Sequence, residues 1–346
     1  MKSIEFSYSQ QLPVLGLFIL LFCPVLHGCE PLHCTDGDFT AAGMVPVKVT
    51  VHSETSLHGQ SLDMLIFSDD DLQYMECWQR VPVRDGDKAS IASISGDKIL
   101  MACSGMTAKS HEDWMWVSSL ASLSDAWTDL ENETSDFPVM SGSCTFKAGS
   151  TLKEQPKISL RRVSGEIHLR SLCCDFSGRA YEGEKLSDVQ VYLTNVSASG
   201  MIWDESGCGS RIINQGRLVM EDVSRFNDRS LVWQRIDGEV GNTKTDTDIR
   251  LRCYPNIVPE EGPGSPYTRL VIQGVLDGEV WYWPIDINRG NGSPEEGIRR
   301  NHIYTYDIVL TRKGSADPDT AIKTGVASIT MEVDKWEDKE EYSVTF

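Results

Sequence analysis

The chain has 346 residues, of which 40% are hydrophobic, and its 51 acidic and 32 basic side chains give a net charge of −19. This length is enough for two domains of ordinary size, each with its own core. The negative charge argues against nucleic acid as a partner, because phosphate binding requires clustered lysine and arginine. The share of apolar residues excludes a chain that is disordered throughout.

Residues 1–28 have the features of an export signal, with an apolar run at 12–26. That run is shorter than the ~20 residues of a membrane-spanning helix. The sequence Leu26-His27-Gly28-Cys29 resembles the bacterial lipobox, whose cysteine receives lipid and becomes the first residue of the mature protein. The resemblance implies acylation of Cys29, for example by palmitate, and a lipid anchor in the outer membrane. An ordinary signal followed by an unrelated cysteine is the alternative.

Eight cysteines remain once Cys23 is lost with the signal and Cys29 is acylated. An even number in an exported chain allows disulfides, and spacing alone does not define their pairing. Buried thiols are an equally open interpretation. The cysteines and histidines have no spacing typical of a metal site, so we expect no bound metal.

After a spacer at residues 29–44, the chain alternates strictly from 45 to 51, which predicts a half-buried strand. Pro46 fits an edge position of such a strand. A second strand at 62–67 ends in three aspartates, 69–71, which we interpret as a solvated turn because a calcium loop would need further ligands. Ser95-Gly96-Asp97 lies between two apolar runs and predicts a hairpin.

Apolar residues recur at steps of three and four between 110 and 132, which predicts one helix, or two short ones that break near Ser122. The parity of apolar positions then changes across Arg161-Arg162, and a β-bulge there would absorb the extra residue. A strand at 189–196 is followed by a glycine-rich stretch at 197–230. We place the domain boundary in this stretch, with an N-terminal domain at 45–205 and a C-terminal domain at 206–346.

The last third of the chain has further strand patterns, and Asp277-Gly278 between two of them is a strong hairpin signal. Many short strands with glycine and proline turns predict an all-β fold. We expect two tandem β-sandwich domains of transthyretin-like or Greek-key topology, with a minor helical insertion in the first.

Sequence motifs of hydrolases, nucleotide-binding loops and zinc proteases are absent from the sequence. We therefore expect a protein that is not an enzyme and that needs no cofactor. Trp281 and Trp283 could form a platform on which sugar rings stack, although alternating tryptophans in a strand more often pack in a core.

Several segments, in this order, resemble the type V fimbrillin family, the lipoprotein pilus subunits of Bacteroidales-type bacteria. The segments are 65–72 (LIFSDDDL), 138–142 (PVMSG), 158–163 (ISLRRV), 191–196 (VYLTNV), 253–256 (CYPN), 300–304 (RNHIY), 317–319 (DPD) and 333–336 (VDKW). The resemblance covers nearly all of the chain from residue 45 onwards.

In that family an N-terminal strand completes the first domain until a protease cuts after an arginine in the following loop. A C-terminal segment of a neighbouring subunit then fills the groove, which is a form of β-strand addition. The resemblance implies that the first strand here carries Val45, Val47, Val49 and Val51, and that the donor strand carries Tyr342, Val344 and Phe346. The implied partners are neighbouring fimbrial subunits.

The sequence departs from this pattern in one respect, because no lysine or arginine occurs between Val49 and Gln79. Cleavage after an arginine in the loop is therefore not available. Two roles are therefore possible: a stalk subunit that another protease processes, or an anchor subunit that stays on the membrane. The sequence does not identify a receptor on a host or bacterial surface. The alternative function is a lipid-anchored carbohydrate-binding protein of the cell surface, with Trp281 and Trp283 as its platform.

Overall fold

The computed structural model describes residues 32–33, 43–53, 57, 60–83, 88–105, 114–149, 155–204, 209, 211–290, 295–322, 326–335 and 338–345. The predicted signal and Cys29 lie outside these residues. All described residues belong to one compact unit, Pro31–Phe346.

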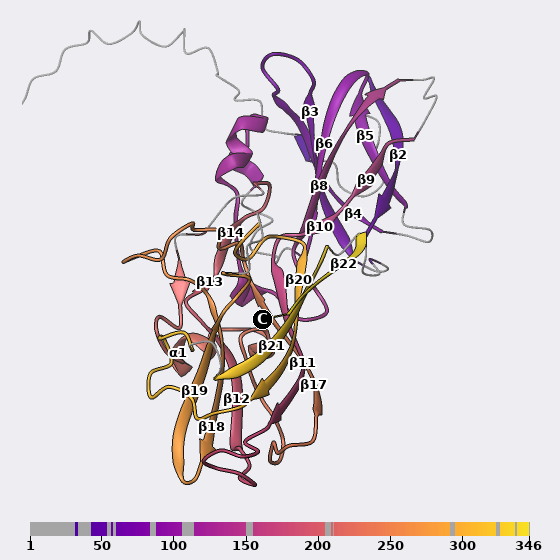
Figure 1. Ribbon diagram of the computed structural model, residues 1–346. Coiled ribbons are helices and arrows are strands. Elements are labelled where there is room, and N and C mark those ends of the chain that lie inside the picture. Colours follow the sequence, from indigo (N-terminus) through magenta and orange to yellow (C-terminus); the bar gives the residue numbers. More distant parts are fainter. Residues whose placement is uncertain are drawn as a thin grey trace, which may run out of the picture. The chain divides into compact units, whose positions relative to one another are not determined.

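Two sheets form a first sandwich (Figure 1). The larger sheet has the order β1 (Leu32–His33), β4 (Met75–Pro82), β3 (Ser61–Ser68), β6 (Gly96–Ser104), β8 (Met140–Ala148) and β10 (Arg161–Arg162). The smaller sheet has the order β5 (Lys88–Ile94), β2 (Met44–His52) and β9 (Lys157–Ser159). Val49 of β2, Met64 of β3 and Leu100 of β6 belong to one core cluster between the sheets.

The larger sheet of the first sandwich is buried on both faces. A second cluster joins Leu65, Phe67 and Trp78 of the sheet to Trp114 and Leu123 from the segment that follows β6. Six consecutive residues of β3 are therefore buried. This explains why that strand, apart from Asp63, is apolar without alternation, as expected for a strand covered on both sides.

Two further sheets form a second sandwich. One has the order β17 (Thr245–Cys253), β11 (Gly165–Cys174), β20 (His302–Leu310), β21 (Ala327–Lys335) and β22 (Asp338–Thr345), and only its β11–β20 pair is parallel. The other has the order β16 (Trp233–Arg235), β12 (Ser187–Thr194), β18 (Arg269–Leu276) and β19 (Glu279–Asp286). One apolar cluster, with Leu169, Val191, Ile272 and Tyr306, fills the space between them.

Short elements connect the two sandwiches. After β12 the chain forms β13 (Val196–Ser197), β14 (Ser199–Met201), β15 (Ile212–Ile213), the helix α1 (Met220–Val223) and the 3-10 turn η4 (Arg229–Leu231). β14 pairs with β7 (Trp127–Asp129), which comes from the segment that covers the first sandwich. Among the residues that the structure describes, every helix is too short or too polar to cross a bilayer.

The all-β sandwich fold predicted from the sequence is confirmed. The strands expected at 45–51 and 62–67 are β2 and β3. The Asp277-Gly278 hairpin joins β18 to β19, and both turn residues have positive φ, 51° and 78°. Two positive φ values define a type I′ turn, whose twist matches the flanking strands.

Two local predictions are wrong for one reason, which is that the chain changes sheet where its pattern breaks. Ser95 separates β5 from β6, which lie in different sheets and form no hairpin. Leu160 separates β9 from β10, so the phase change at Arg161-Arg162 is a crossing from one sheet to the other rather than a bulge. The strands β11 and β12 precede the boundary expected at 205–206, and they pair with β20 and β18, which follow it.

The helix expected at 110–132 is a series of short elements. The structure has 3-10 turns at η2 (Leu120–Asp125) and η3 (Leu130–Asn132), with β7 between them. Of the residues in the periodic pattern, Trp114, Val117, Leu123 and Leu130 are nevertheless buried, whereas Trp127 is 41% exposed. Pairing of β7 with β14, a contact distant in sequence, replaces the helical hydrogen bonds.

Candidate functional site

The first strand, β2, inserts its valines into the core of the first sandwich. Val47, Val49 and Val51 are fully buried, Val45 is half-buried, and Lys48 points to solvent. Burial of each valine is worth roughly 1.5–3 kcal/mol. Loss of this strand would therefore remove a large part of the stability typical of a domain, about 5–15 kcal/mol.

The backbone of β2 has neighbours on both sides. It pairs antiparallel with β5 from Met44 to Thr50, and parallel with β9 from Thr50 to His52. Pro46 lies opposite Ala92 of β5, in the half of β2 that β9 does not reach. Because proline lacks an amide hydrogen, it fits this half of the strand.

The loop from β2 to β3 carries no lysine or arginine, and part of it is fixed by hydrogen bonds. Leu57 is buried, and its carbonyl accepts a hydrogen bond from the Gln60 amide at 2.9 Å. The Gln60 carbonyl in turn accepts one from the Val83 amide at 2.9 Å. These contacts tie the end of the loop to the residue that follows β4 in the larger sheet.

The two basic residues on either side of this loop both lie within strands. Lys48 is exposed, but its backbone pairs with Ser90 of β5. Arg80, the first arginine after β2, donates two hydrogen bonds of 2.8 Å to buried Asp63, and this bonding raises the pKa of Arg80. The Trp114 indole donates a third bond to Asp63 at 3.2 Å. Proteases cleave exposed flexible loops, so neither residue is a ready cleavage site.

The last strand, β22, lies at the edge of its sheet and pairs antiparallel with β21. Positions 342 and 344 lie opposite Val333 and Met331, which pack against the core of the second sandwich. Phe346, the third predicted donor residue, lies outside the described residues. The structure keeps β2 and β22 in different sheets of one chain.

The two tryptophans considered as a sugar platform do not form one. The side chain of Trp283 is fully buried, and its indole donates to the Arg312 carbonyl at 3.0 Å. The ring of Trp281 is half-buried and lies 4.4 Å from the Lys313 ammonium. Alternation places both rings on the core side of β19, so the core interpretation of these residues is the correct one.

Several cysteines are thiols in protected surroundings. Cys103, Cys144, Cys173 and Cys174 form no disulfide. Burial raises the thiol pKa of Cys144 to about 11 and that of Cys174 to about 12. These thiols therefore stay protonated and unreactive at neutral pH. Within the described ranges no cluster of His, Cys, Asp and Glu is arranged to hold a metal ion.

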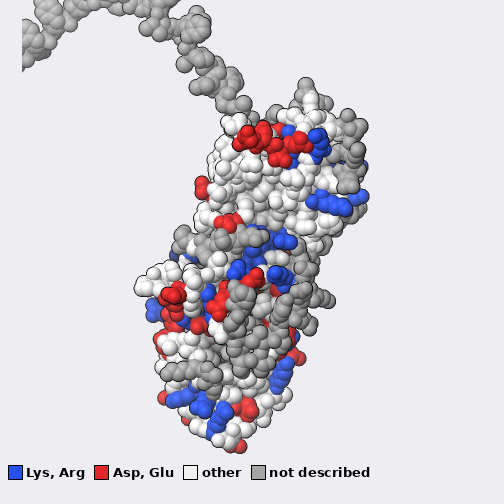
Figure 2. All heavy atoms as spheres, turned by 45° about the horizontal axis from the view of Figure 1, so that its top comes forward, with Lys and Arg blue, Asp and Glu red and all other residues white. Residues whose placement is uncertain are grey.

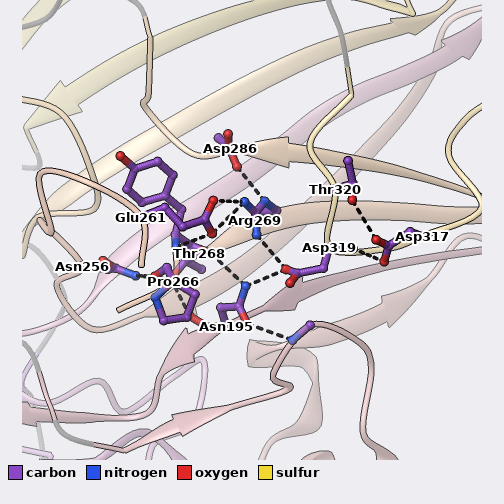
Figure 3. A network of polar contacts seen from close by, with 12 residues as sticks. Asn195, Asn256, Glu261, Pro266, Thr268, Arg269, Asp286, Asp317, Asp319 and Thr320 are labelled. Carbon is purple, nitrogen blue, oxygen red and sulfur yellow. Dashed lines mark hydrogen bonds and ion pairs between the residues drawn. The ribbon is translucent and has the colours of Figure 1, made fainter. Parts of the chain in front are cut away.

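A polar network that the sequence did not reveal surrounds Arg269 of β18 (Figure 3). The guanidinium is buried and binds three carboxylates, at 2.6, 2.7 and 2.7 Å, from Glu261, Asp286 and Asp319. Burial raises the pKa of Asp286, while Arg269 opposes this. The partners lie 8, 17 and 50 residues from Arg269 in the chain, so no local pattern could have joined them.

This network holds residues 311–322, which we call the strap, along β19, the edge strand of the second sandwich. Asp319 belongs to the strap. Ser315 and Tyr282 of β19 exchange backbone hydrogen bonds of 2.7 and 2.9 Å, and the Ile322 amide donates to the Pro284 carbonyl at 2.9 Å. The strap therefore covers the edge of β19, which would otherwise present unpaired backbone groups.

A buried acid lies where elements of both sandwiches meet. Glu133 is fully buried and accepts a hydrogen bond from the Tyr254 hydroxyl. Burial raises the pKa of Glu133, while the bond from Tyr254 and the charges of Arg252 and Arg162 oppose this. Arg252 also donates to the Thr134 and Ser135 carbonyls, at 3.0 and 2.9 Å.

Surface charge is mixed on the face that Figure 2 shows, with basic side chains next to acidic ones and an acidic group at one end. The Asp69–Asp71 turn is exposed, as predicted, and Asp70 accepts hydrogen bonds from the Leu72 and Gln73 amides at 3.0 and 2.9 Å. These backbone bonds lower the pKa of Asp70.

Solved structures reveal what this arrangement is similar to, although no protein-family model and no curated protein matches the sequence. A fimbrilin from Porphyromonas gingivalis W83 has 15% identity and a TM-score of 0.60, over 84% of this chain and 97% of that one. A candidate cell adhesion protein from Bacteroides eggerthii has 14% identity and a TM-score of 0.61, over 87% and 98%. Another, from Parabacteroides distasonis, has 14% identity and a TM-score of 0.59, over 85% and 97%.

The chain therefore has the fold of Bacteroidales fimbrilins and candidate adhesion proteins over nearly its whole described length. This confirms the resemblance to type V fimbrillins that the ordered segments predicted. At these identities the likeness defines the fold, and the roles of individual residues have to be argued from the geometry above.

Proposed function

We propose that this chain is a structural subunit of a type V pilus, or fimbria, that supports adhesion at the cell surface. It is exported as a lipoprotein, is held on the outer membrane through acylated Cys29, and joins neighbouring subunits by donor-strand exchange. The observation that carries the proposal is the geometry of β2, whose buried valines complete a sandwich with the fold of a fimbrilin.

Strand physics supports the exchange. A groove without β2 would leave β5 unpaired and expose the apolar residues that now contact the valines. Such a groove would be filled by another strand with the same alternation. The last strand suits the role of donor, because β22 has a single neighbouring strand and its edge position allows it to detach without disturbing the rest of its sheet.

We further infer that β2 is retained and that the subunit is of the anchor type. Such a subunit donates its last strand but does not accept one, and it stays tied to the membrane. The support is the absence of lysine and arginine from the loop after β2, together with the positions of Lys48 and Arg80 within paired strands.

N-terminal sequencing of surface material from the native host tests this inference. A retained strand predicts a chain that still begins at acylated Cys29, whereas a start between Ser53 and Leu62 would identify a stalk subunit. A His58→Arg variant supplies an arginine in the loop and should release the first strand. The matched His58→Gln variant should stay intact.

Heat-stable ladders of oligomers on a gel test the subunit role itself. A Val344→Asp substitution should abolish ladders, because a charge cannot enter an apolar groove. A Ser343→Asp substitution on the opposite face of the same strand should leave them. Absence of this chain from the ladders extracted from the native host, where other subunits can accept its last strand, would overturn the proposed function.

A further inference from the structure

A cavity of about 520 Å³ lies in the second sandwich, between β19, β20, β21 and the strap. Two of its lining residues, Arg179 and Gly290, are exposed, whereas Tyr306 and Met331 are buried. The cavity therefore opens at the surface and reaches the core. Its volume is in the range of pockets that hold a small molecule, about 300–1,000 Å³.

Polar and apolar groups share the lining of this cavity. Four apolar side chains come from β19, the strap and β21: Ile285, Ile322, Ile329 and Met331. The polar residues Asp286, Asn288 and Arg289 lie beside them. A purely apolar ligand would take water away from these polar groups without replacing its hydrogen bonds, which costs free energy. The lining therefore fits a ligand whose own surface is partly polar and partly apolar.

The two arginines of the cavity keep most of their hydrogen-bond donors. Arg179 donates to the Thr311 carbonyl of the strap at 2.8 Å. Arg289 lies over the Tyr267 ring at 4.2 Å and donates to the Asn256 carbonyl at 3.1 Å. Within the part of the chain that the structure describes, neither arginine forms an ion pair with a carboxylate. Because a guanidinium binds a carboxylate through two parallel hydrogen bonds, both side chains are available to an anionic ligand.

A buried hydroxyl in the cavity also has an unused donor. The Tyr306 hydroxyl accepts a hydrogen bond from the Asn288 amide at 3.3 Å, and no described residue accepts one from it. Burial raises the pKa of Tyr306, so the hydroxyl keeps its proton at neutral pH. The carboxylate that lines the cavity, Asp286, is already bound by Arg269 at 2.7 Å. The groups left for a ligand are therefore donors, which favours a ligand that is anionic and rich in oxygen acceptors.

We propose that this cavity binds an acidic sugar, that is, a sugar ring that carries a carboxylate. The carboxylate binds Arg179 and Arg289. The C–H face of the ring packs on Ile285 and Met331, and one of its oxygens accepts a hydrogen bond from Tyr306. A sugar fits because its surface combines C–H groups with hydroxyls, as the lining combines apolar and polar side chains. The site adds a ligand to the proposed subunit and does not depend on strand donation.

Calorimetric titration of the full chain tests the class of ligand. Methyl glucuronide should bind about tenfold more tightly than methyl glucoside, in which a hydroxymethyl group replaces the carboxylate and the charge-assisted hydrogen bonds are lost. Octanoate, which has the carboxylate but not the polar ring, should also bind more weakly than methyl glucuronide. Absence of methyl glucuronide binding, equal affinities for the two sugars, or tighter binding of octanoate would each overturn the proposal.

Substitutions test whether the sugar lies in this cavity. Arg179→Gln should weaken methyl glucuronide binding about tenfold and leave the midpoint of urea unfolding unchanged, because the side chain is exposed. Ala321→Trp places a ring in the cavity and should abolish binding. Arg235→Gln removes an exposed arginine that pairs with Asp188 outside the cavity, so it should leave binding unchanged. Binding that survives both cavity variants would overturn the proposal, because the sugar would then lie elsewhere.

Discussion

The two sandwiches hold their terminal strands in different ways. In the first, β2 lies between β5 and β9 and buries three valines completely. In the second, β22 has β21 as its single neighbour. The strap covers β19, the edge strand of the other sheet in the second sandwich. It is held there by an ion pair to Arg269 and by a few backbone hydrogen bonds.

The two terminal regions are therefore stabilised by different interactions: apolar burial holds β2, whereas an ion pair and backbone hydrogen bonds hold the strap. Buried apolar contacts hardly respond to salt or pH, whereas partly exposed ion pairs weaken as salt rises. We therefore expect β2 to leave only when the first sandwich unfolds, and the strap and β22 to open locally. This difference fits the proposed subunit, which retains its first strand and donates its last strand to a neighbouring subunit.

A buried charge in β2 should have the largest effect. Val49→Asp should lower the free energy of unfolding by about 4 kcal/mol or more, because the carboxylate would lie in an apolar core without a partner. Lys48→Asp places the same side chain on the exposed face and should cost less than about 1 kcal/mol. Urea unfolding followed by tryptophan fluorescence measures both. Similar losses in the two variants would mean that β2 is not buried as described.

Removal of the central cation in the second sandwich should have the next largest effect. Arg269→Met leaves three carboxylates close together and should lower the free energy of unfolding by about 3 kcal/mol. Amides of the strap should exchange faster than those of β2. Arg235→Met, which breaks an exposed pair with Asp188, is the control and should change little. Protection of the strap that persists in Arg269→Met would show that its backbone bonds are sufficient.

The sequence revealed strands well where one face of a strand is polar. Alternation located β2, and the Asp277-Gly278 pair located the β18–β19 hairpin. Both signals are local, because side-chain parity and positive φ depend on adjacent residues. The alternating valines of the candidate site were identified for the same reason.

Sheet membership could not be read in the same way. The breaks at Ser95 and Leu160 look like a turn and a bulge along the chain, but they are crossings between sheets. Trp114 packs on the larger sheet through contacts with Asp63, 51 residues away. The Arg269 network depends on similar long-range contacts. Such contacts arise from how the strands pack, which periodicity does not encode.

The pH dependence of the free energy of unfolding should distinguish Glu133, which lies where the two sandwiches meet, from exposed carboxyl groups. Because its folded pKa is raised, the folded state holds a proton that the unfolded state has lost, so stability falls as pH rises from the unfolded pKa through the folded one. Glu133→Gln should remove this fall and be more stable at pH 8 by on the order of 1 kcal/mol. The exposed control Glu184→Gln should keep it. An unchanged pH dependence in Glu133→Gln would show that another group is responsible.

The smallest effect is expected at Asp307, and it has the opposite sign. A hydrogen bond from Arg170 lowers the pKa of Asp307, and burial opposes this. The pair therefore contributes stability above the ordinary carboxyl pKa and loses it as pH falls through the lowered one.

The side chain of Arg170 is 43% exposed and that of Asp307 is 21% exposed. Solvent screening should therefore limit the loss in Asp307→Asn to less than about 1 kcal/mol. Half a molar salt should reduce the loss further. Asp246→Asn, at an exposed position of β17 on the other side of β11, is the matched control. The side chain is 43% exposed in Arg170 and 4% exposed in Arg269. A loss in Asp307→Asn as large as that in Arg269→Met would show that this difference in exposure does not determine how much each ion pair contributes.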